Sequence, residues 1–108
     1  MIKEGSMKPQ RRIYKGGRIY KGWRRGERVQ SVRELRRGTR IICVSHQFKT
    51  ENLAVVTNAR PHPFPEPTRL VYAAWAKGRA GKRAYEFEFA IWDFMVEHGL
   101  YYRAERTG

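Results

Sequence analysis

Cations and aromatic rings alternate between residues 11 and 25 of this chain. Residues 1–40 hold 14 Lys and Arg against three acidic residues, a balance of +11, whereas residues 41–108 hold nine against seven, a balance of +2. Each cation placed beside a phosphate releases condensed counterions, so a charge distribution this uneven favours a polyanionic partner. Interleaved rings can stack on bases, which suits RNA or a single strand better than a duplex. We therefore predict a nucleic-acid-binding site, for RNA or DNA, formed by Arg11, Arg12, Tyr14, Lys15, Arg18, Tyr20, Lys21, Trp23, Arg24, Arg25, Arg36 and Arg37.

A second group of cations lies in a glycine-containing turn farther along the chain. Its members are Lys77, Arg79, Lys82 and Arg83. The spacing GxxGK differs from the GxxxxGK[ST] of a Walker A loop, which also requires a helix to follow, so a P-loop is not indicated. A basic hairpin tip can still touch phosphate, and an ordinary solvated turn explains the same residues. We predict at most a secondary phosphate contact here.

Two other functions remain open for the basic segment. It could dock on an acidic face of a neighbouring copy, or on an acidic protein partner, and so build an assembly. The chain could also be a metal-independent endoribonuclease, with candidate residues Arg40, His46, Thr57 and Arg60, although no spacing singles them out and the idea depends on analogy between folds. An inert solubilising tail is a weaker interpretation, since such tails are poor in aromatic residues. We therefore expect a binding protein that is not an enzyme.

The residues that hold metals or carry acid–base chemistry are scattered. His46, His62 and His98 have no paired spacing, and Cys43 is the single cysteine. Glu86 and Glu88 alternate along a predicted strand, where both carboxylates would be solvated and unperturbed. We expect no metal, no cofactor and no small-molecule substrate.

Composition also suggests a compartment. One cysteine allows no intramolecular disulfide, which fits a reducing environment. No apolar stretch approaches the roughly 18 residues that a membrane span needs. We expect a cytoplasmic protein with no membrane partner.

Two regions must position these residues: a basic N-terminal arm over residues 1–30 and a small β-domain over residues 31–108. The arm repeats Arg-Ile-Tyr-Lys-Gly at 12–16 and 18–22, and Gly16-Gly17 between the copies can form a two-residue turn. This pattern predicts a hairpin at 13–20.

The rest of the chain has the period and composition of an all-β domain. An approach segment at 31–38 should anchor Val32 and Leu35 and turn at Gly38, and residues 58–68 form a proline-rich loop with Phe64 as its anchor. Extended runs at 40–48, 53–59, 69–77 and 83–90 are followed by a short helix or 3₁₀ turn at 91–98, which ends at Gly99, and by a last strand from residue 100. We predict an SH3-like barrel of about five antiparallel strands, because closure hides strand edges, with an open sheet covered by the helix as the alternative.

Overall fold

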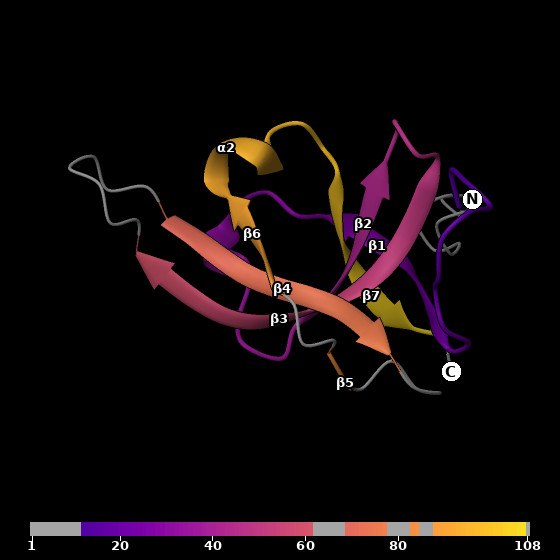
Figure 1. Ribbon diagram of the computed structural model, residues 1–108, viewed down its shortest axis with the longest axis horizontal. Helices are drawn as coiled ribbons and strands as arrows, with labels where there is room; N and C mark the ends of the chain where they lie inside the picture. The colour runs from indigo at the N-terminus through magenta and orange to yellow at the C-terminus, as the bar shows by residue number, and fades with distance from the viewer. Residues whose placement is uncertain (1–11, 62–68, 78–82, 85–87, 108) are drawn as a thin grey trace, which may run out of the picture.

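The computed structural model describes residues 12–61, 69–77, 83–84 and 88–107 (Figure 1). All of the paired strands are antiparallel, which confirms the predicted all-β class. In chain order the elements are β1 (Trp23–Arg28), the 3₁₀ turn η1 (Val32–Glu34), β2 (Arg40–Ser45), β3 (Thr50–Pro61), β4 (Arg69–Lys77), β5 (Arg83–Ala84), β6 (Phe89–Trp92), the short helix α2 (Asp93–Val96) and β7 (Tyr101–Arg106).

Six of these strands form one curved sheet, and the two-residue β5 adds to the end of β4. The order is β1-β7-β2-β3-β4, with β6 along Leu70–Ala73 and β5 along Ala76–Lys77 of β4. Within the described part of the chain no ladder joins β1 to β6, so the sheet is not closed by hydrogen bonds there. The SH3-like barrel therefore stays a prediction.

β3 pairs with β2 along one edge and with β4 along the other, and its pairing with β4 contains a bulge. Residues 50–55 pair with β2, whereas residues 54–61 pair with β4, and the register shifts between Val56 and Asn58. A bulge increases the bend and twist of a strand. The Thr57 hydroxyl at this position lies within hydrogen-bond distance of two acceptors, the carbonyl oxygen of Tyr72 (3.1 Å) and the carboxylate of Glu88, and its one proton can be donated to either. β3 and β4 consequently run as a long bent pair across the molecule (Figure 1).

The main core lies on one face of the sheet, beneath η1 and α2. Alternate residues of the strands bury their side chains there, as period 2 requires. Val32 and Leu35 join this core and Gly38 turns the chain at φ +90, as predicted for the approach segment. The Asp93 carboxylate accepts hydrogen bonds from the Ser31 hydroxyl and the Val32 N–H, so it connects α2 to η1. The buried members are Val29, Val32, Leu35, Ile41, Cys43, Ala54, Val56, Val71, Ala73, Ile91, Val96 and Tyr101.

A smaller core lies on the opposite face, and the N-terminal segment covers it. Its buried residues are Ile42, Leu53, Val55 and Ala76, and the side chains packed against them include Ile19, Tyr20 and Trp23. Part of the predicted arm therefore completes a core, and its residues 23–28 form the edge strand β1.

The hairpin predicted at 13–20 does not form. Residues 16–18 instead run parallel to the start of β3, where the Glu51 N–H donates to Gly16 O (3.0 Å) and the Leu53 N–H donates to Arg18 O (2.9 Å). β4 pairs with β3 only from Ala54 onwards, so this stretch of β3 has an edge that the segment covers. Satisfying those strand donors outweighs the local turn propensity of the two glycines.

The remaining elements agree in part with the predictions. β4 has the predicted bounds, β2 ends three residues early, and β3 extends the predicted run at both ends. The helix at 91–98 is only the four residues of α2, followed by a turn at Gly99 (φ +73). The run at 83–90 is seen as β5 and β6, while residues 85–87 and 62–68, with Phe64, lie outside the described residues. No helix among the described residues is long and apolar enough to cross a membrane.

Candidate nucleic-acid interface

Two of the three rings predicted to stack on bases lie against the sheet. The Tyr20 hydroxyl donates to Ala76 O (3.0 Å), and its ring packs on the smaller core. Trp23 packs on the same core, with the guanidinium groups of Arg40 and Arg106 at 5.4 and 4.8 Å from its ring centroid. These two rings attach the segment to the sheet.

Tyr14, the third ring, lies at the turn between β2 and β3. Its hydroxyl is 2.7 Å from His46 Nδ1, and the two rings meet edge to face with centroids 5.6 Å apart. Tyr14 is half-buried and His46 is exposed. The pair joins the segment to the turn and lies at the surface.

A buried carboxylate holds the segment in place. Glu51 has no exposed surface, and its Oε2 accepts the Tyr14 N–H (2.6 Å). Its Oε1 lies 3.9 Å from Arg25 Nε in an ion pair, and the Arg25 guanidinium stacks over Tyr102 with 4.5 Å to the ring centroid. A buried charge is tolerated only with such partners, so Arg25 has a structural role in the fold.

Two more of the predicted binding cations also have partners within the fold. Arg24 pairs with Glu105 (3.4 Å), and Arg12 donates to the carbonyl oxygens of Gly16 (2.6 Å) and Glu51 (3.3 Å). Five others are exposed and have no carboxylate at ion-pair distance among the described residues: Lys15, Arg18, Lys21, Arg36 and Arg37. Arg11 lies outside the described residues.

The secondary basic turn is described only at its base. Lys77 ends β4 and is in register with Arg83 of β5. Arg79 and Lys82 lie outside the described residues.

A groove lies next to the exposed cations. One pocket of about 500 Å³ opens between the β2–β3 turn and strands β4 and β6, and a second of about 500 Å³ adjoins it. Asn52 and Trp75 line both pockets, so the two pockets meet at these side chains, and we call the two together the groove. The first is lined by Cys43, Val44, Ser45, His46, Gln47, Phe48, Thr50, Asn52, Trp75, Phe89, Leu100 and Tyr101, and the second by Gly17, Arg18, Asn52, Leu53, Trp75 and Ala76.

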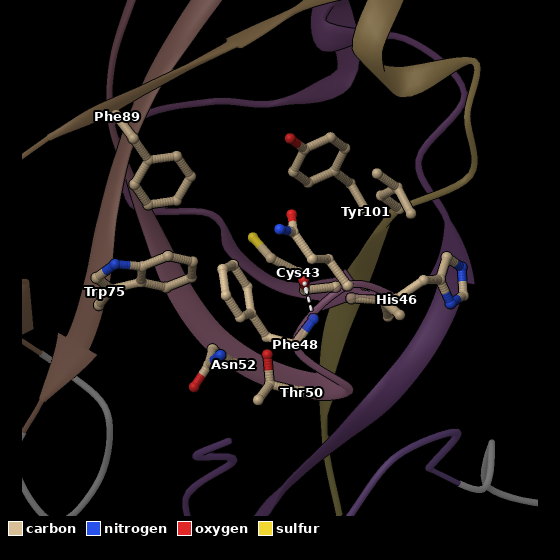
Figure 2. Close-up of a pocket in the computed structure, with 12 residues that line it drawn as sticks. Cys43, His46, Phe48, Thr50, Asn52, Trp75, Phe89 and Tyr101 are labelled. Atoms are coloured by element: carbon tan, nitrogen blue, oxygen red, sulfur yellow. Dashed lines mark hydrogen bonds between the residues drawn. The ribbon is translucent and has the colours of Figure 1, made fainter. Parts of the chain in front are cut away.

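Large aromatic side chains are exposed in this groove. Phe48 is 70% exposed, Trp75 is 40% exposed, and Trp75 stacks on Phe89 with centroids 4.5 Å apart at 30°. Figure 2 shows these three rings around the same cavity, with His46 directed away from them. Phe48 and Trp75 were not among the residues predicted for the site, although the polar neighbours of Phe48, His46, Gln47 and Lys49, are a signal for an exposed ring.

The floor of the groove contains two titratable groups that are neutral at physiological pH. Burial raises the pKa of Tyr101 to about 12, and the neighbouring Cys43 adds to the shift. Burial also raises the pKa of the Cys43 thiol well above its usual value. Neither group therefore supplies a thiolate or phenolate nucleophile.

The residues considered for RNA cleavage are not brought together. Arg40 begins β2 and contacts Trp23 and Gly38 O, whereas His46 follows the other end of that strand. Thr57 is bound to Tyr72 and Glu88, and the Arg60 side chain is outside the described part. Among described residues, no three His, Cys, Asp or Glu side chains are grouped to hold a metal ion.

Comparisons of this chain with protein-family models, with curated proteins and with solved structures found no match. The chain itself combines an all-β sheet with a cationic N-terminal segment that packs on the smaller core and a groove with exposed aromatic side chains.

Proposed function

We propose that this chain is a nucleic-acid-binding protein that is not an enzyme, with RNA or a single strand as the favoured partner. The observation that supports it is the arrangement of the N-terminal segment, whose rings pack on the sheet while Lys15, Arg18 and Lys21 remain exposed. Because the backbone of this segment is already ordered by β3, binding a polyanion requires little further ordering. Phosphates are the ligands that such a row of cations attracts most strongly.

The proposal also includes a second group of exposed cations. Arg36 and Arg37 lie between η1 and β2, in a turn fixed by the Arg36 N–H donating to Thr39 Oγ1 (3.1 Å). Both are exposed, so they can contact phosphates without first losing an intramolecular ion pair. With +13 formal net charge, the protein would also attract nucleic acid at long range.

Salt dependence tests the proposal. Binding of a fluorescent single-stranded oligonucleotide by nuclease-treated protein should weaken by ~10³ to 10⁵ between about 50 and 200 mM salt if six to ten phosphates are contacted. Replacing Lys15, Arg18 and Lys21 together by Gln should reduce the magnitude of the log–log salt slope by ~2, or ~0.7 per lost contact. The matched single variants are Arg18→Gln and Arg28→Gln, because both residues are exposed arginines and Arg28 lies outside the proposed surface.

Three results would contradict the proposal. The first is the absence of binding, the second is a flat salt dependence, and the third is an equal effect of the Arg18 and Arg28 substitutions. A nuclease-treated protein that forms rings or filaments in light scattering would instead support docking between copies. Cleavage of labelled RNA in EDTA would support the nuclease alternative.

A further inference from the structure

The two most exposed aromatic side chains of the groove are placed where a planar ligand could enter. Phe48 is 70% exposed in the turn between β2 and β3, and Trp75 is 40% exposed on β4. Covering such rings would gain ~25 cal/mol of hydrophobic free energy for each Å² of apolar surface removed from water. Trp75 is supported by its stack on Phe89, so its position is held by the sheet before a ligand arrives.

The charges around the groove indicate whether a cationic or an anionic ligand fits it. Among the described residues that line the two pockets there is no Asp or Glu, and Arg18 lines the second pocket. A cationic ligand such as an alkylated lysine would meet no compensating carboxylate among these described residues and would be repelled by the net charge of the protein. An anionic ligand with a flat ring can stack on the exposed rings of Phe48 and Trp75 and place its negative charge near Arg18.

Polar groups in the groove are oriented by the backbone. The Arg18 N–H donates to Asn52 Oδ1 (2.9 Å), which fixes the Asn52 amide and leaves its Nδ2 as a donor toward a ligand acceptor. Ser45 Oγ accepts the Phe48 N–H (3.2 Å), which holds the turn that carries the Phe48 ring. Asn52 lines both pockets and lies near Trp75 and Phe48 (Figure 2), and Arg18 joins it in the lining of the second pocket.

We propose that this groove receives an unpaired nucleobase of a single-stranded nucleic acid, stacked against Trp75 and Phe48, with Asn52 Nδ2 donating to the base and Arg18 on the adjoining phosphate. The inference depends on the proposed function and assigns its base contacts to residues outside the N-terminal segment. It moves the stacking role from Tyr20 and Trp23, whose rings pack on the sheet, to rings that are exposed. Duplexes would not use the pocket, because their bases are already stacked.

The test is the substitution Phe48→Ala, with Phe94→Ala as the matched control. Phe94 is also strongly exposed (57%) but lies on α2, outside the groove. With a short homopyrimidine single strand, Phe48→Ala should weaken binding by ~5- to 150-fold and leave the salt slope unchanged. With a duplex of equal length, both variants should bind as the unmodified chain does. Trp75→Ala should lose single-strand affinity in the same way, with urea unfolding showing that the variant is folded.

The outcomes separate this inference from the function on which it depends. Failure of the unmodified chain to bind any nucleic acid would refute the proposed function itself. Salt-dependent binding that Phe48→Ala leaves unchanged would refute the base pocket alone. Equal losses for single strand and duplex, or an equal loss with Phe94→Ala, would also overturn it, because a base-stacking site predicts neither.

Discussion

Replacing Gly17 by alanine is expected to detach the N-terminal segment from β3. Gly17 has φ +89, and a Cβ there would lie 2.4 Å from the carbonyl oxygen and 2.8 Å from the backbone nitrogen of Glu51. Gly38 provides a matched control, since it has φ +90 but a Cβ built on it meets no atom within 4 Å. Both substitutions carry the strain of a left-handed backbone, and only the first also collides with a strand.

The expected magnitudes follow from these contacts. Alanine in a left-handed conformation costs ~1 kcal/mol, which is the whole effect expected for Gly38→Ala. The atoms that collide at Gly17 belong to backbone, so the segment must move away and lose the hydrogen bonds from Glu51 N–H to Gly16 O and from Leu53 N–H to Arg18 O. At ~1 kcal/mol net for each bond, Gly17→Ala should lower the free energy of unfolding by ~3 kcal/mol.

Urea denaturation of the two variants measures this difference, and amide hydrogen exchange locates it. In Gly17→Ala the amides of Glu51 and Leu53 should lose protection, whereas those between β2 and β7 should keep theirs. Equal unfolding free energies for the two variants, with unchanged protection at Glu51 and Leu53, would refute the view that the segment is part of the fold.

Three further predictions concern buried groups. Glu51→Ala should lower the free energy of unfolding by ~3 kcal/mol in urea denaturation, because it leaves the Arg25 charge without its buried carboxylate, and a neutral effect would contradict that role. Burial raises the pKa of Tyr101 from 10.0 to about 12, so the unfolded chain releases this proton first and stability should fall by ~1 kcal/mol between about pH 9 and pH 11. Tyr101→Phe should remove that part of the decline, and an identical pH profile would count against it. Because burial raises the pKa of the Cys43 thiol, a thiol reagent should label the folded protein much more slowly than the urea-unfolded chain, and equal labelling rates would contradict this prediction.

Much of the sheet was predictable because strand signals are local. The β4 run is a short apolar stretch with Val71, Tyr72 and Trp75 between the charged residues Arg69 and Lys77, and its predicted bounds at 69–77 match the structure. Val32, Leu35 and Gly38 were predicted as anchors and turn for a similar reason, since apolar spacing and a glycine identify them within eight residues. The bulge at Thr57 was not predictable, because it depends on the register between β3 and β4, which is set by the pairing of the two strands.

The candidate site was less predictable than the sheet. Cations near the N-terminus were identified by composition, but the partners of Arg24 and Arg25 are Glu105 and Glu51, which are distant in sequence. Their ion pairs exist only because the sheet order β1-β7-β2-β3 brings β1 near β7 and β3. Sequence proximity of rings and cations was thus a poor guide to which of them face a ligand.

By itself the sequence determined the amount and location of positive charge, the all-β class and most strand positions, because these properties depend on composition and on periodicity within a few residues. Only the tertiary structure decided that Tyr20 and Trp23 face the protein while Phe48 and Trp75 face solvent. The reason is that an apolar surface assembled from β2, β3 and β4 competes for the nearby rings and buries those that reach it. Rings beyond that surface stay exposed, and they line the groove beside Arg18.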